Sequence, residues 1–115
     1  MHADNYQYRA HETSLKMPTM RFAPNQVYSL VGLANEAGEV AGVLKKAIRG
    51  DYGDEPEENY VFIDKLKGEL GDVAWYLAEV CTQFGFDLGT IMSDNLEKLR
   101  SRQARGVIMG SGGER

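Results

Sequence analysis

The segment from about residue 56 to residue 85 is apolar on nearly every side of the helix that its spacing predicts. Its apolar residues are Val61, Phe62, Ile63, Leu66, Leu70, Val73, Ala74, Trp75, Tyr76, Leu77, Val80, Cys81 and Phe84. Such a helix must be covered all round. Three further helices in a chain of 115 residues are too few to cover it. We therefore expect a partner subunit, in a homodimer or homotetramer, to complete the cover.

The rest of the chain also has helical spacing, with apolar residues recurring at steps of three, four or seven. The strict alternation of a β-strand is absent, so the sequence predicts an all-α four-helix bundle. We expect the other three helices at about residues 4–17, at residues 24–49, and from Asp87, as the N-cap, to about Gln103.

The chain is predicted to form one domain, residues 1–115. Within it, residues 1–23 are an N-terminal helix and loop, and residues 106–115 are a flexible glycine-rich tail. The net charge of −4 argues against a nucleic-acid partner. No apolar run is long enough to span a membrane. The single cysteine fits a reducing compartment, so we expect a cytoplasmic protein, in the host cytoplasm if a phage encodes it.

Two acid pairs repeat one pattern, with a glycine inside each. The pairs are Glu36 and Glu39 in "EAGE", and Glu69 and Asp72 in "ELGD". In each pair the two acids lie one helical turn apart, along an apolar stripe. Carboxylates in such a setting repel one another and are costly to bury.

No basic residue stands among the apolar residues that flank each acid pair on its helix face. We therefore expect a divalent cation to neutralise the negative charge of the acids. Carboxylate ligands without histidine favour Mg²⁺, with Mn²⁺ as a substitute. We expect all four acids to bind it, with Gly38 and Gly71 letting the two helices approach. The alternative is that such acids decorate solvated faces, and a single pair would favour that alternative.

A third group of residues suits phosphate. Asn95, Lys98 and Arg102 share one face of the predicted last helix, and an amide, an ammonium and a guanidinium can bind phosphate oxygens. Lys45 in "KKAIRG" is another candidate, although cations near helix ends also offset the helix dipole. Trp75 is a candidate surface for a base, the alternative being a core residue.

Together these residues resemble a known family. The order E-x-x-E, spacer, E-x-x-D and N-x-x-K-x-x-x-R is similar to that of the MazG-like all-α nucleoside triphosphate pyrophosphohydrolases, from about Val27 to Arg105. The resemblance implies hydrolysis of an NTP or dNTP between the α and β phosphates, with magnesium, in nucleotide-pool control or sanitation. It also implies that the four acids are the metal ligands and catalytic residues, and that Asn95, Lys98 and Arg102 contact phosphates.

Two positions depart from the family pattern. Asn35 stands where many members have a further acid, and Gly113 stands where some relatives have an acid in the tail. Two other functions therefore stay open. One is a non-catalytic helical dimerisation module that binds nucleotides or protein, and the other is a phosphatase that releases single phosphates. We expect a deoxynucleotide substrate by analogy with compact members of the family.

Overall fold

The computed structural model describes residues 1–15, 24–53 and 59–110 of the chain. These residues form four helices and no strand, which confirms the predicted all-α class. The helices are α1 (Ala3–His11), α2 (Asn25–Arg49), α3 (Asn59–Phe84) and α4 (Leu88–Ala104). Among the described helices, none has both the length and the apolar character needed to cross a membrane.

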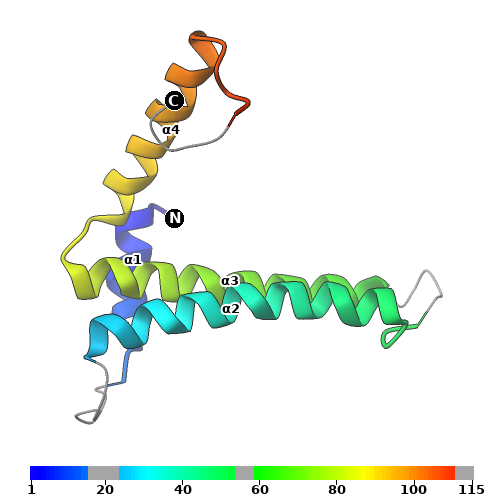
Figure 1. The fold of residues 1–115 in the computed structure, drawn as a ribbon. Coiled ribbons are helices and arrows are strands. Elements are labelled where there is room, and N and C mark those ends of the chain that lie inside the picture. The colour runs from blue at the N-terminus through cyan, green and yellow to red at the C-terminus, as the bar shows by residue number, and fades with distance from the viewer. Residues whose placement is uncertain (16–23, 54–58, 111–115) are drawn as a thin grey trace.

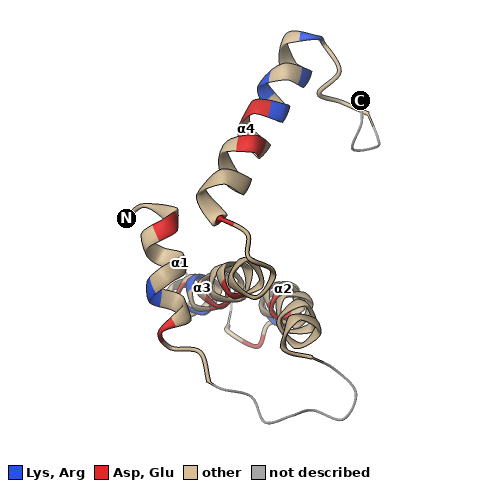
Figure 2. Ribbon diagram, turned by 90° about the vertical axis from the view of Figure 1, so that its left-hand side faces the viewer, with Lys and Arg blue, Asp and Glu red and all other residues tan. Residues whose placement is uncertain are grey.

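The centre of the fold is an antiparallel pair formed by α2 and α3 (Figure 1). Helix α1 packs on α3, on the side away from α2, so α3 lies between two helices (Figure 2). Helix α4 contacts α1 and projects away from the α2–α3 pair in both views. A single chain therefore leaves the long sides of α2, α3 and α4 open.

Helix α1 ends at His11, earlier than the predicted end near residue 17, because local hydrogen bonds stop it. The amide of Thr13 donates to the carbonyl of Ala10 at 3.0 Å, and the Thr13 hydroxyl donates to the same oxygen at 2.7 Å. These bonds satisfy a carbonyl that the next helical turn would otherwise need. Residues 16 and 17 of the predicted continuation, and the predicted start of α3 near Pro56, lie outside the described ranges.

The other helix ends follow their local sequence signals. Gly50 ends α2 with a left-handed φ of 89°, which glycine adopts without steric cost. Asp87 caps α4 as predicted, because its side chain accepts a hydrogen bond from the Thr90 amide at 3.0 Å. Two α1 side chains also bond this end of α4: Asp4 accepts from the Gly89 amide, and Gln7 accepts from the Leu88 amide.

The buried core of one chain is small. It centres on Ala10, Ala78, Cys81 and Leu88, where α1, α3 and α4 meet. Many large apolar side chains stay exposed, among them Val31, Leu44, Val61, Leu70, Leu77, Met92, Leu96 and Leu99. The radius of gyration is 17.7 Å, whereas a compact domain of this length has about 13 Å. The structure thus agrees with the expectation that one chain cannot cover α3.

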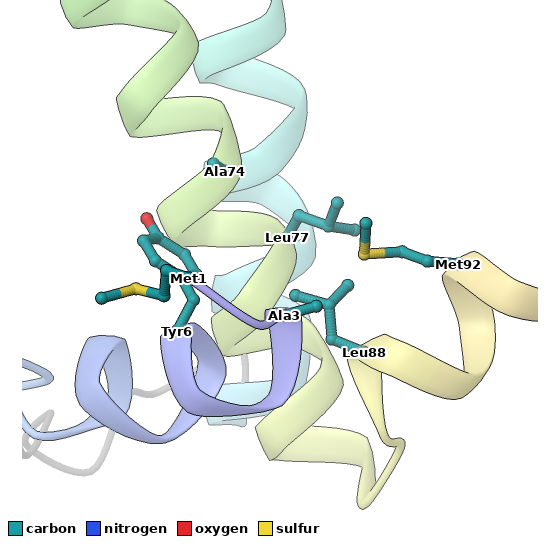
Figure 3. A pocket seen from close by; sticks show the side chains of 7 residues that line it. All are labelled: Met1, Ala3, Tyr6, Ala74, Leu77, Leu88 and Met92. Atoms are coloured by element: carbon teal, nitrogen blue, oxygen red, sulfur yellow. The ribbon is translucent and has the colours of Figure 1, made fainter.

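An open apolar pocket of about 320 Å³ lies beside this core, where α1, α3 and α4 converge (Figure 3). Its lining consists of Met1, Ala3, Tyr6, Ala74, Leu77, Leu88 and Met92. None of the described side chains that line it is charged, so it has the character of a packing surface left uncovered by the single chain.

Candidate functional site

Three of the four predicted acids gather where α2 faces α3. Glu36 of α2, and Glu69 and Asp72 of α3, each place one carboxylate oxygen within 4.8 Å of the other two. The antiparallel pairing of the helices brings them together, since Glu36 of α2 meets Glu69 and Asp72 of α3, which follow it by 33 and 36 positions in the chain. Glu39, one turn further along α2, lies outside this cluster of three within the described chain.

The acids are less buried than we expected from the apolar residues around them in the sequence. Glu36 and Glu69 are half-buried, whereas Glu39 and Asp72 are exposed. The prediction that both pairs point away from solvent is therefore wrong for one member of each pair. The reason is that α2 and α3 leave the face carrying these acids without a third helix of the same chain over it.

The electrostatics of the cluster act chiefly on Glu36. Its pKa is raised above the ordinary value, first by partial desolvation and then by the negative charges of Asp72 and Glu69. A hydrogen bond between the Glu36 and Glu69 side chains raises the pKa further. Glu36 therefore holds a proton more tightly than an isolated glutamate does. A cation at this point would relieve the repulsion that raises its pKa.

The close approach of α2 and α3 beside the acids depends on Gly32. A Cβ atom at residue 32 would overlap the ring of Tyr76, which lies across α2 at that point. By contrast, a Cβ atom at Gly38 or Gly71 would meet no atom within 4 Å in the described chain. The interpretation that Gly38 and Gly71 let these two helices approach is thus wrong for the single chain, and Gly32 has that role.

One side of the acid cluster opens into a cleft of about 360 Å³, which we call the aromatic cleft. Its lining residues are Thr13, Glu36, Asp72, Trp75 and Tyr76. The indole N–H of Trp75 donates to the Thr13 hydroxyl at 2.7 Å, and the Trp75 and Tyr76 rings meet edge to face at 5.0 Å. The rings are thus held in place beside the acids.

The Tyr76 phenol stays protonated near neutral pH. Its pKa is raised, first by burial, then by a hydrogen bond with Tyr28, and then by the charges of Tyr28, Glu36 and Asp72. A neutral phenol is a hydrogen-bond donor. The aromatic cleft therefore combines ring surfaces with a hydroxyl next to the acids.

A second cleft, of about 260 Å³, lies on the other side of the cluster, and we call it the lysine cleft. It is lined by Glu39, Val43, Lys46, Tyr52, Lys65, Gly68, Glu69 and Asp72. Asp72 borders both clefts. Sequence reasoning missed Lys46 and Lys65. Helical spacing is a signal that could have found them, because Lys46 follows Glu39 by two turns and Lys65 precedes Glu69 by one.

The predicted phosphate contacts of the last helix lie apart from the acids in the single chain. Asn95 and Lys98 are exposed on α4, which projects away from the α2–α3 pair, and Arg102 is buried near the end of α4. None of the three lines either cleft. Lys45 is also exposed and lies outside the lining of the lysine cleft, where its neighbour Lys46 takes part.

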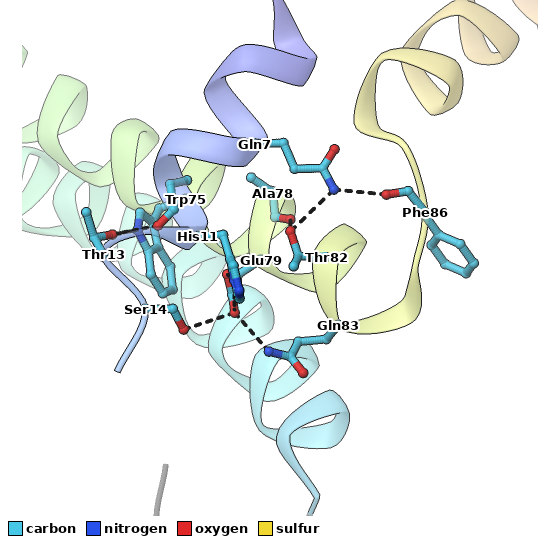
Figure 4. Close-up of polar contacts among 11 residues, drawn as sticks. Gln7, His11, Thr13, Ser14, Trp75, Ala78, Glu79, Thr82, Gln83 and Phe86 are labelled. Atoms are coloured by element: carbon cyan, nitrogen blue, oxygen red, sulfur yellow. Dashed lines mark hydrogen bonds and ion pairs between the residues drawn. The ribbon is translucent and has the colours of Figure 1, made fainter. Parts of the chain in front are cut away.

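A buried carboxylate that the sequence did not single out anchors the start of the loop after α1 (Figure 4). Glu79 of α3 is 4% exposed and contacts three side chains. His11 Nδ1 lies 3.1 Å from its Oε2, while the Ser14 hydroxyl and the Gln83 amide donate to its Oε1 at 3.0 and 2.9 Å. The network holds residues 11–14 on α3 and so supports the Thr13 wall of the aromatic cleft.

The donors of the acid cluster fit a hard divalent cation. All three are carboxylate oxygens, which Mg²⁺ and Mn²⁺ prefer. Two oxygens bound to one Mg²⁺ ion are at most about 4.2 Å apart, twice the bond length of 2.1 Å. The separations of up to 4.8 Å thus need only small side-chain adjustments. An ion bound here would offset the negative charges that raise the pKa of Glu36.

The antiparallel pair of α2 and α3 thus gathers acids between an aromatic cleft and a lysine-bearing cleft. The chain belongs to the MazG nucleotide pyrophosphohydrolase domain family, whose model matches residues 27–107. The match spans the acids, both clefts except Thr13, and all of α4.

The chain is also similar to a curated phage protein. It is 41% identical over 117 aligned residues to the "Gene 37 protein" of Mycobacterium phage L5, with all of both chains covered. No solved structure matches the chain.

Proposed function

We propose that this protein hydrolyses a deoxynucleoside triphosphate to the monophosphate and pyrophosphate, with Mg²⁺ or Mn²⁺, in the cytoplasm and in nucleotide-pool control or sanitation. The observation that carries the proposal is the cluster of Glu36, Glu69 and Asp72 beside a cleft with two aromatic rings. Membership of the MazG family supports a nucleotide as the substrate.

The acids bind the metal in this proposal. Glu36, Glu69 and Asp72 are the first ligands, and exposed Glu39 completes the set by a change of rotamer. Magnesium, when bound, offsets phosphate charge and lowers the pKa of water for attack on the α phosphorus. Because the protein itself has a net charge of −4, the acids need this counter-charge before they can approach a triphosphate.

The aromatic cleft receives the nucleoside. The Trp75 face offers a stacking surface for the base, and its N–H is already used by Thr13, which keeps the ring orientation constant. The Tyr76 ring, beside Glu36 and Asp72, adds a second aromatic wall for the sugar, while its hydroxyl is hydrogen-bonded to Tyr28. These side chains orient the substrate so that the scissile bond lies at the acids.

The test measures pyrophosphate and orthophosphate separately after incubation with each of the four dNTPs. We expect pyrophosphate and monophosphate in equal amounts with magnesium or manganese, and no turnover with a chelator. Glu36→Gln and Asp72→Asn should abolish turnover, because each removes a charged ligand. Glu12→Gln, which changes an exposed acid at the end of α1, serves as the control and should keep full activity.

Each alternative predicts a different outcome. Orthophosphate as the sole product would contradict cleavage between the α and β phosphates and indicate a phosphatase. Binding without turnover would indicate the non-catalytic module. Full activity after exhaustive chelation would contradict the metal.

A further inference from the structure

The acid cluster separates two clefts of opposite character along the α2–α3 pair. Among the residues that the structure describes, the lining of the aromatic cleft includes Thr13, Trp75 and Tyr76 and no lysine or arginine. The lining of the lysine cleft includes Lys46 and Lys65. One cleft suits an aromatic group and the other suits a negatively charged group. A substrate that carries one such group at each end therefore binds in a single orientation.

We propose that Lys46 and Lys65 bind the β- and γ-phosphates, so that the nucleotide lies along the helix pair with its base toward Trp75 and its leaving pyrophosphate toward Tyr52. This orientation rests on the proposed hydrolysis and adds to it the residues that receive the leaving group. It also replaces Lys45, which the sequence suggested, with its neighbour Lys46.

The positions of the two lysines suit this role. Lys46 follows Glu39 by seven residues on α2, and Lys65 precedes Asp72 by seven residues on α3. Because the helices are antiparallel (Figure 1), both steps lead about 10 Å toward the same end of the pair. A cation from each helix thus borders the same cleft, and a flexible lysine can turn back toward the acids.

The positive charges of Lys46 and Lys65 are also not neutralised by ion pairs with the acids of the site. Within the described residues, neither ammonium forms an ion pair with Glu39, Glu69 or Asp72. Lys65 Nζ instead lies 5.7 Å from the centroid of the Tyr52 ring, which is within cation–π range and leaves the lysine free to move. The two charges stay available for phosphate oxygens, to which ammonium groups form strong charge-assisted hydrogen bonds.

In this orientation the two products, pyrophosphate and the monophosphate, occupy different ends of the site. Measuring the binding of each product therefore tests the orientation without turnover. We would measure the binding of inorganic pyrophosphate and of each dNMP by calorimetry, with magnesium present. Lys46→Met and Lys65→Met should each weaken pyrophosphate binding about tenfold and leave dNMP binding unchanged. Trp75→Leu should weaken dNMP binding and leave pyrophosphate binding unchanged.

Matched controls exist on both helices. Lys45→Met and Lys67→Met remove an exposed cation from α2 and α3 outside the cleft lining, and should leave pyrophosphate binding unchanged. All four lysine positions are exposed, and melting curves would verify that the variants fold.

Three results would overturn the orientation: equal losses in the control variants, loss of dNMP binding in the lysine-cleft variants, or no pyrophosphate binding by the unchanged protein. These outcomes are distinct from failure of the proposed function, which product analysis alone decides. A protein that releases only orthophosphate, yet loses pyrophosphate binding on Lys46→Met, would keep the lysine assignment and lose the assigned cleavage.

Discussion

At the scale of single residues, the site depends on a contact between one glycine and one tyrosine. Gly32 has no side chain where the Tyr76 ring crosses α2, and Tyr76 in turn reaches Tyr28 and the charges of Glu36 and Asp72. A glycine inside a helix costs about 1 kcal/mol relative to alanine. At Gly32 the space given to Tyr76 offsets that cost.

Alanine substitutions at two glycines of α2 should therefore have opposite effects. Gly32→Ala forces the Tyr76 ring out of place, and we expect it to lower the free energy of unfolding by about 1–3 kcal/mol and to reduce activity. Gly38→Ala meets open space in the chain and should raise the free energy of unfolding by about 1 kcal/mol. Urea unfolding of both variants is the measurement. A loss of stability at Gly38 that equals the loss at Gly32 would contradict this account.

At the scale of elements, α1 links the site to α4. Its last turn is held on α3 by the buried Glu79, and its first two turns bond the amide groups at the start of α4 through Asp4 and Gln7. Helix α1 thus supports the Thr13 wall of the aromatic cleft at one end and sets the direction of α4 at the other.

Glu79→Ala should loosen this link. The variant leaves His11, Ser14 and Gln83 without their shared acceptor, and the expected cost is about 1–3 kcal/mol of unfolding free energy. We also expect faster amide exchange in α1 and a higher KM, because the Thr13 wall is no longer held. Glu12→Ala, at an exposed position of the same turn, is the control. Unchanged exchange in α1 would show that Glu79 does not anchor it.

At the scale of the whole molecule, the open surfaces call for a second copy of the chain. Helices α3 and α4 expose large apolar side chains, among them Leu70 and Leu77 of α3 and Leu96 of α4, and the pocket of Figure 3 stays uncovered. Asn95 and Lys98 are exposed on α4, and this helix projects away from the α2–α3 pair that carries the acids (Figure 1). We propose that α4 of a second copy covers α3 and brings these two residues to the acid cluster.

Mixing two inactive variants tests this arrangement. Glu36→Gln removes an acid and Lys98→Ala removes a cation, and in a mixed dimer one of the two sites keeps both wild-type groups. An equal mixture that exchanges freely should regain about a quarter of wild-type activity. Light scattering should first show a dimer or tetramer. A stable monomer at micromolar concentration, or no regain after mixing, would contradict the shared site.

The helices and their ends were largely predictable, because their causes are local. Apolar spacing indicated all four helices, Asp87 was identified as an N-cap, and Gly50 ends the helix that was predicted at residues 24–49. The candidate acids were found for the same reason, since the spacing of E-x-x-E and E-x-x-D places each pair on one helix face.

The tertiary structure alone decided which residues meet. The pairing of α2 with α3 placed Glu36 with Glu69 and Asp72 while leaving Glu39 outside the cluster. It also put Lys46 rather than Lys45 at the cleft, and it gave the close approach to Gly32 rather than Gly38. These outcomes depend on the rotation of one helix against another, which is set by packing across the pair and not by the order of residues within either helix.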